Sequence, residues 1–218
     1  MIDILKLAIA LMVISLAAGL AIGVTNSRTK DKIAEQNELR LQSSLEMVFG
    51  NSVEIKEEQG DDDLPDLYWS AHSEDGLQGY AFEVASRGYA GEIRYIVGVD
   101  ATGTITGITI LEQSETPGLG SRIEEAASED YIWTFLFSSS EKSKPWFTQQ
   151  FEGLSLTKPI GIESSAGEWH TLDSEKRNKL NEQNKITAIT GSTISTRAVI
   201  NGLEQDVAPY IKALKGTN

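Results

Sequence analysis

Residues 77–111 read LQGYAFEVASRGYAGEIRYIVGVDATGTITGITIL, and this stretch carries the strongest pattern in the chain. Residues 80–84, 93–99 and 104–110 alternate or are rich in β-branched and aromatic side chains, which is typical of strands. Glycine-containing turns separate the three runs, and residues 100–103 suit a short hairpin connection. The stretch therefore predicts an antiparallel meander of three strands.

Helical and irregular segments surround this meander. The last of them, residues 195–214, places five apolar side chains on one helical face: Val199, Leu203, Val207, Tyr210 and Leu214. Pro209 is expected to kink or shorten that helix, because proline cannot donate a backbone hydrogen bond. Three weaker signals are a short alternating run at 53–55, a helix followed by a hydrophobic patch at 121–137, and a polar, loop-like region with short helical turns at 161–185. Strands grouped together with helices around them indicate an α+β domain over residues 51–218.

An apolar segment precedes this domain. Residues 7–24 read LAIALMVISLAAGLAIGV, and the hydroxyl of Ser15 is their only polar side chain. At about 1.5 Å per residue this run approaches the roughly 30 Å hydrocarbon core of a bilayer. We therefore predict a transmembrane anchor at 1–28 and a connecting amphipathic helix at 29–50. A cleaved signal peptide is the alternative, but its apolar core would span about 7–15 residues, whereas this run continues past Gly19.

Charged residues near the anchor leave its orientation open. Lys6 lies on one side of the apolar run, and Arg28, Lys30 and Lys32 lie on the other. The positive-inside preference alone would keep the large domain in the cytoplasm. Long domains, however, cross membranes largely regardless of such charges.

Composition excludes several classes of function. The formal net charge of −13 would repel a phosphate backbone, so we expect no nucleic-acid partner. Cysteine is absent, which excludes disulfides, thiolate-bound zinc, iron–sulfur ligation and cysteine nucleophiles. With only His72 and His170 and no H-E-x-x-H pattern, we expect no metal ligand. The acidic run at 61–63 lacks the ligand spacing of an EF-hand and is expected to be a solvated loop.

The most informative segment for function is residues 187–196, which read TAITGSTIST and lie directly before the terminal helix. A glycine turn that opens onto a helix presents free N–H groups and the positive end of a dipole, which suits a phosphate. The alternative is a helix N-cap that is merely rich in hydroxyls. On spacing alone, the simple cap is the more common case.

This segment also resembles the Ser-Gly-Ala-Thr motif of the FMN-binding domain family, which G subunits of Rnf complexes share with C subunits of sodium-translocating NADH:quinone reductases. Two further stretches support the resemblance: ETPGLG at 115–120, and Trp146 with Gln150, Phe151 and Gly153. In that family the last threonine of the motif forms a phosphoester with FMN. The resemblance therefore implies covalent FMN on Thr193.

The resemblance also implies which other residues bind the cofactor. They are Thr190, Gly191, Ser192, Glu115, Thr116, Pro117, Gly118, Leu119 and Gly120. In residues 115–120, the glycines would admit the flavin, Leu119 would cover it, and Thr116 or Glu115 would lie near its polar edge. Composition alone would favour a simple turn there, because Pro-Gly suits the central positions of a type II turn. The aromatic side chains of Trp146, Phe147 and Phe151 are expected in the core.

Three positions depart from the family motif: Thr190 replaces the usual serine, Ser192 the usual alanine, and Thr187 a frequent aspartate. The first change keeps a hydroxyl, and the second adds a competing hydroxyl beside Thr193. The third removes a carboxylate that could help the attaching enzyme recognise its substrate. Because a threonine hydroxyl is a poor nucleophile without a base, attachment should need a separate transferase. The resemblance implies an FMN transferase that uses FAD.

We expect from the resemblance a single-pass protein of the cell (inner) membrane, with its FMN domain on the periplasmic or outer side. It would transfer electrons within an Rnf-type, Na⁺- or H⁺-translocating oxidoreductase complex and would carry out no complete reaction alone. The implied partners are membrane and peripheral subunits that hold another covalent FMN, riboflavin and iron–sulfur centres. Alternatives are the C subunit of the sodium-translocating quinone reductase, a flavin-free membrane-tethered binding module, and a flavin reductase, for which no nicotinamide fingerprint is present.

Overall fold

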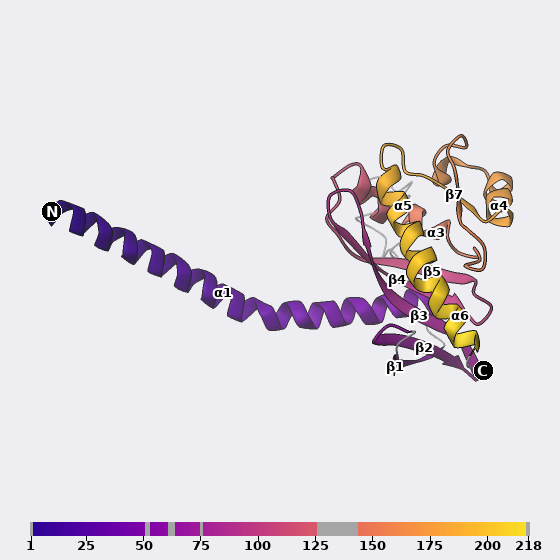
Figure 1. Cartoon of the computed structure of the whole chain (residues 1–218), viewed down its shortest axis with the longest axis horizontal. Coiled ribbons are helices and arrows are strands. Elements are labelled where there is room, and N and C mark those ends of the chain that lie inside the picture. Colours follow the sequence, from indigo (N-terminus) through magenta and orange to yellow (C-terminus); the bar gives the residue numbers. More distant parts are fainter. Residues whose placement is uncertain (1, 51–52, 61–63, 75, 126–143, 217–218) are drawn as a thin grey trace, which may run out of the picture. The chain divides into compact units, whose positions relative to one another are not determined.

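The computed structural model describes residues 2–50, 53–60, 64–74, 76–125 and 144–216, which form two compact units, Met1–Ser43 and Ser44–Asn218. Helix α1 runs without a break from Ile2 to Phe49 (Figure 1). It covers, from Ile2 onward, the apolar segment predicted as an anchor and the connecting helix predicted at 29–50. Gly50, at a φ of 84°, ends the helix as expected, and its N–H bonds to Glu46 O at 2.7 Å. Among the described residues, α1 alone is long and apolar enough to cross a membrane.

The second unit is built on a five-stranded antiparallel sheet. Its strands are β1 (Glu54–Gln59), β2 (Leu67–Ser73), β3 (Gly76–Arg87), β4 (Glu92–Asp100) and β5 (Ile105–Gln113), which lie side by side in chain order. The predicted three-stranded meander is confirmed as β3–β5. Strand β2 was not expected from the sequence, because Ser70 and His72 interrupt its apolar residues.

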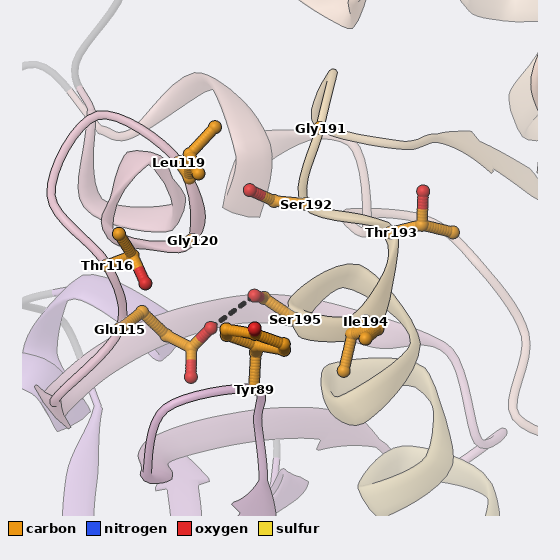
Figure 2. Close-up of a pocket in the computed structure, with 10 residues that line it drawn as sticks. All are labelled: Tyr89, Glu115, Thr116, Leu119, Gly120, Gly191, Ser192, Thr193, Ile194 and Ser195. Atoms are coloured by element: carbon orange, nitrogen blue, oxygen red, sulfur yellow. Dashed lines mark hydrogen bonds between the residues drawn. The ribbon is translucent and has the colours of Figure 1, made fainter.

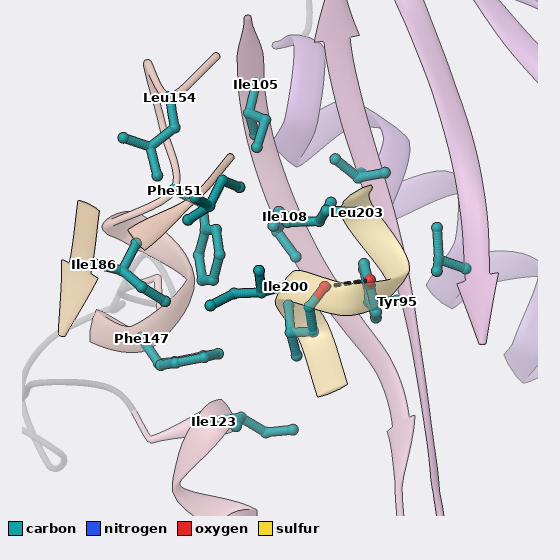
Figure 3. Packing of buried hydrophobic residues seen from close by; sticks show 14 of the residues in the cluster. Tyr95, Ile105, Ile108, Ile123, Phe147, Phe151, Leu154, Ile186, Ile200 and Leu203 are labelled. Atoms are coloured by element: carbon teal, nitrogen blue, oxygen red, sulfur yellow. Dashed lines mark hydrogen bonds between the residues drawn. The ribbon is translucent and has the colours of Figure 1, made fainter. Parts of the chain in front are cut away.

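One face of this sheet carries the terminal helices. Helix α5 (Thr193–Gly202), a π-helical turn (Leu203–Val207) and α6 (Ala208–Gly216) follow one another, and Tyr95 of β4 donates its hydroxyl to Val199 O at 2.9 Å. Figure 3 shows Ile200 and Leu203 between the sheet and the buried rings of Phe147 and Phe151. The π-helical turn ends two residues before Pro209, whose missing N–H prevents regular α-helical bonding to the preceding turn. The predicted disturbance by proline is thus a local widening of the helix.

The end of α1 meets the sheet within this second unit. Val48 is 5% exposed, and a side-chain carbon at Gly98 would overlap its Cγ1. Gly107, the partner of Gly98 across β4 and β5, faces the backbone of the same residue. Gly98 therefore makes the space that the last helical turn occupies.

A smaller region packs beyond the terminal helices. It contains α3 (Trp146–Gln149), β6 (Gly161–Glu163), the 3₁₀ helix η2 (Trp169–Thr171), α4 (Ser174–Glu182) and β7 (Lys185–Thr187), and β6 pairs with β7 in parallel. The helical turns expected within 161–185 are confirmed as η2 and α4, whereas the short strands β6 and β7 were not expected. Asp173 caps α4 by accepting Lys176 N–H at 2.8 Å. The helix predicted at 121–137 is a 3₁₀ helix, η1 (Gly120–Glu124), as far as residue 125. Its remainder, like the acidic run at 61–63, lies outside the described residues.

The aromatic motif has a structural role in this region. Trp146, Phe147 and Phe151 are at most 1% exposed, as predicted for core aromatics. Fully buried Gln150 donates to Thr187 O at 3.1 Å and accepts Thr187 N–H at 2.8 Å. The amide thus pairs with both backbone groups of Thr187 and fixes the strand from which the hydroxyl-rich turn emerges.

Candidate functional site

The hydroxyl-rich segment folds into a tight turn that opens onto α5. Gly191 has a φ of 78°, a left-handed conformation that favours glycine, and Ser192 N–H bonds to Ile189 O at 2.9 Å. Ser192 is the residue before the helix, and Thr193 is its first residue. The predicted glycine turn at a helix N-terminus is confirmed. Its free N–H groups and helix dipole favour an anion at this point.

Ser192 and Thr193 have opposite environments. Ser192 is 5% exposed, its Oγ is inaccessible to solvent, and it finds no hydrogen-bond partner among the described residues. It does not cap the helix with its side chain. Thr193 is exposed. Only the second hydroxyl is open to a modifying enzyme.

The second predicted segment folds as a turn followed by η1. Leu119 N–H bonds to Thr116 O at 3.1 Å around Pro117 and Gly118, and Gly118 has a φ of 74°. This is the type II turn that composition predicts. The turn directs Leu119, which is 45% exposed, toward the Gly191 turn.

The two segments face each other across a pocket (Figure 2), with Leu119 on one side and Ser192 and Thr193 on the other. The pocket has a volume of about 450 Å³, within the usual range for small-molecule and cofactor sites. Its lining is Tyr89, Glu115, Thr116, Leu119, Gly120, Gly191, Ser192, Thr193, Ile194 and Ser195. Seven of the ten predicted residues are in this set, whereas Thr190, Pro117 and Gly118 are not.

Three lining residues escaped the sequence analysis: Tyr89, Ile194 and Ser195. Tyr89 lies in the turn between β3 and β4 and is 71% exposed, which is unusual for a tyrosine in a sheet protein. Its position inside the glycine-rich turn at 87–91 was the available signal. Ile194 and Ser195 directly follow Thr193, so the first turn of α5 contributes as a whole.

Glu115 is a buried carboxylate in the pocket wall. It is 5% exposed, accepts the hydroxyl of Ser195, and accepts Ala90 N–H at 3.0 Å. A side-chain carbon at Gly88 or Gly120 would collide with this carboxylate, so both glycines make room for it. None of the ion pairs in the described part of the chain includes Glu115. Its negative charge is therefore balanced by hydrogen-bond donors and not by a cation.

A second carboxylate lies beside the turn. Glu168 receives a two-pronged contact from Arg122, at 2.7 and 2.8 Å, and accepts Thr190 N–H at 3.0 Å. The guanidinium of Arg122, together with the Thr190 N–H, lowers the pKa of Glu168 to about 2. No sequence pattern indicates this pair, because 46 residues separate its members.

The arrangement fits a flat cofactor with a phosphate. The helix N-terminus supplies anion-binding N–H groups, the pocket is walled by Tyr89, Leu119 and Ile194, and the buried Ser192 hydroxyl has no partner within the described structure. This fold and site define the class of FMN-binding domains, and the profile of the FMN-binding domain matches residues 88–208. The profile of the RnfG N-terminal region matches residues 1–48.

Relatives of known name agree with these matches. The G subunit of the Na⁺-translocating ferredoxin:NAD⁺ oxidoreductase complex of Acetobacterium woodii is 30% identical and aligns with 94% of this chain and 90% of its own. The G subunit of the ion-translocating oxidoreductase complex of Pasteurella multocida is 31% identical, with 96% and 92% covered. The chain therefore belongs to the family of G subunits of ion-translocating oxidoreductase complexes.

Two solved structures share the fold. The C subunit of the Na⁺-translocating NADH-quinone reductase of Parabacteroides distasonis has a TM-score of 0.53 at 21% identity, over 85% of this chain and 95% of that one. NqrC of Shewanella oneidensis has a TM-score of 0.54 at 14% identity, over 84% and 99%. The α+β fold predicted from the sequence is confirmed.

Proposed function

We propose that this chain is the electron-transferring subunit of a membrane-bound, Na⁺- or H⁺-translocating oxidoreductase of Rnf type, and that it carries FMN as a phosphoester on Thr193. Membership of the G-subunit family supports the complex. One observation supports the attachment residue above others. Thr193 is an exposed hydroxyl at the start of α5 and lines a pocket of about 450 Å³.

Burial argues against the competing hydroxyl. Ser192 stands beside Thr193 in the sequence, but its Oγ is inaccessible to solvent. Thr190 is exposed but lies outside the pocket lining. Thr193 combines exposure and contact to the pocket with a place at the start of α5, where the helix N–H groups can bind the phosphate, whereas the exposed pocket residue Thr116 lies in the other turn.

The attachment reaction balances with FAD as donor. Thr193 Oγ1 would form one bond to the FMN phosphorus as the pyrophosphate bond breaks, and AMP would leave. The hydroxyl proton would pass to a base on the FMN transferase, because no activating base contacts Thr193 in the described structure. Once bound, FMN supplies one- and two-electron redox chemistry.

The protein's part is to hold and tune this cofactor. The first N–H groups of α5 would bind the phosphate, since they have no partners within the helix. Leu119, Tyr89 and Ile194 would cover the ring. Thr116, Gly120, Gly191 and Ser195 complete the pocket wall, and Thr190, Pro117 and Gly118 would act by shaping the two turns.

Two alternatives have weaker support. The C subunit of the sodium-translocating quinone reductase shares the fold, but the match of residues 1–48 to the RnfG N-terminal region favours a G subunit. In a flavin-free binding module the turn would only cap a helix, yet Ser192 does not cap it with its side chain.

The domain would lie on the extracytoplasmic side of the cell membrane, anchored by α1. There the ester would retain the flavin away from cytoplasmic pools.

The test compares two neighbouring hydroxyls. The full chain is expressed with an FMN transferase, and flavin is detected by fluorescence after denaturing electrophoresis and by intact mass. Thr193→Val should lose the added mass of one FMN, whereas Ser192→Ala should keep it. Flavin retained in Thr193→Val, or absent from the unchanged chain made with the transferase, would contradict the proposal.

A further inference from the structure

Arg122 and Glu168 form the centre of a network beside the Gly191 turn. Their side chains are only 22% and 13% exposed, and the guanidinium meets both carboxylate oxygens. Such a two-pronged contact fixes orientation as well as distance. Surface ion pairs contribute little to stability, but a partly buried pair with this geometry restricts the segments that carry it.

This network joins the two predicted turns of the site to each other. Arg122 belongs to η1, directly after the 115–120 turn, and also contacts Glu125 at 2.7 Å. Its guanidinium lies 5.7 Å from the ring centre of Trp146, whose indole donates to Glu125 at 3.3 Å. Glu168 holds the second turn through Thr190 N–H.

The contact to Thr190 is placed where the turn is least constrained. Thr190 is exposed and immediately precedes Gly191, the residue with the widest choice of backbone conformations. Fixing the backbone of one residue costs about 1–2 kcal/mol of conformational entropy, so a turn without this contact would sample other conformations. Thr193 lies two residues after Gly191, so the conformation of this turn sets its position.

We propose that Arg122 and Glu168 are positioning residues, which hold the Thr190–Gly191 turn in the conformation that an FMN transferase can modify at Thr193. This inference rests on the proposed function. Neither residue lines the pocket, so their effect passes through the backbone of the turn. The pair also places a carboxylate beside the turn, at Thr190 N–H.

Rates of flavin attachment test this role in the full chain with purified transferase and FAD. Glu168→Ala removes both the charge and the acceptor, and should slow attachment at least tenfold. Glu168→Gln can still accept Thr190 N–H, so its rate of flavin attachment should lie between those of Glu168→Ala and the unchanged chain. Arg122→Lys keeps the charge without the two-pronged contact, and should also be intermediate. Glu83→Ala, which breaks the ion pair with Arg94 on the sheet, is the matched control and should attach flavin at the normal rate.

A second measurement separates positioning from general stability. Hydrogen exchange at the Thr190 amide should become at least tenfold faster in Glu168→Ala, while exchange in β3 and β4 stays unchanged. Normal attachment by a Glu168→Ala chain with a fast-exchanging Thr190 amide would overturn the inference. So would equal slowing in Glu83→Ala. An unchanged chain that takes up no flavin would instead overturn the proposed function, and the inference would fall with it.

Discussion

At the scale of single residues, the carboxylate of Glu115 is the charge most able to influence a flavin. It is buried in the pocket wall, and no cation of the described chain pairs with it. At an effective dielectric constant near 20, a unit charge acts on another about 10 Å away by about 1–2 kcal/mol. A negative wall charge disfavours the more negative, reduced states of a bound flavin.

Glu115→Gln should therefore raise the midpoint potential of the attached flavin. The amide is nearly the same size and can still accept the Ser195 hydroxyl or Ala90 N–H. The expected rise is about 20–50 mV for a two-electron couple, and redox titration of the purified, flavin-loaded chain would measure it. Ser114→Ala, on the neighbouring residue outside the pocket lining, is the control. An unchanged or lower potential in Glu115→Gln would show that this charge does not tune the flavin.

Glu168 predicts an acid-dependent loss of stability. Its pKa is about 2 in the folded chain and near 4.5 when unperturbed, because Arg122 and the Thr190 N–H favour the charged form. A lowered folded-state pKa stabilises the fold above the unfolded value, and this contribution is lost as pH falls from about 4.5 toward 2. Urea unfolding should show the unchanged chain about 1–3 kcal/mol more stable than Glu168→Gln at pH 7. The difference should shrink by pH 3, and a gap that stays constant would contradict this linkage.

At the scale of elements, the junction of α1 with the sheet depends on Gly98 and not on its paired residue Gly107. A side-chain carbon at Gly98 would overlap Val48 Cγ1, whereas one at Gly107 would meet Val48 Cα at an ordinary 3.5 Å. Gly98→Ala should therefore destabilise the domain by about 1–3 kcal/mol. Gly107→Ala, on the adjacent strand, should be neutral or stabilising by up to about 1 kcal/mol. Thermal unfolding of the two detergent-solubilised variants makes the comparison, and equal shifts would contradict it.

The elements that could be predicted are those whose pattern is local. Strands β3–β5 alternate over many residues, and glycines punctuate them, so the meander was readable. Strand β2 carries Ser70, which is buried but satisfied by Glu58 at 2.8 Å, and such compensation depends on a neighbouring strand. Helix α4 is largely polar, with Leu180 its only buried residue, so it lacks an apolar stripe.

The site, too, has a part that local sequence patterns predict and a part that depends on the fold. The turns at 115–120 and 190–193 could be predicted because each contains a glycine that adopts a positive φ, whereas their role in binding a cofactor was implied only by the family resemblance. That the two turns face each other across one pocket, and that Tyr89 joins them, follows from the fold and not from either segment. The Arg122–Glu168 pair is likewise set by packing between segments far apart in the sequence. Local patterns therefore predicted the two turns, whereas the structure gives the contacts that position them.

At the scale of the whole molecule, the two compact units separate attachment from chemistry. Residues 2–43 form only helix, with apolar side chains such as Leu7 and Leu11 exposed, whereas the pocket belongs entirely to the second unit. Exposing a leucine side chain to water costs about 1.5–3 kcal/mol relative to burying it. This cost disappears if lipid surrounds the helix. Removing residues 1–24 should move the protein from the membrane fraction to the soluble one. Cell fractionation measures this, and a truncated chain that stays with the membrane would point to a second attachment.

The orientation of the chain can be determined because it contains no cysteine. Charges flanking the apolar run favour a cytoplasmic domain, yet they constrain long domains weakly, and a flavin held by an ester has its greatest advantage outside the cytoplasm. We therefore expect a single cysteine at the exposed position Asn178→Cys to react with a membrane-impermeant maleimide in intact cells. Asp3→Cys, before the apolar run, should react only after the membrane is opened. The reverse labelling pattern would place the domain in the cytoplasm and remove the reason for a retained flavin, because free FMN is present there.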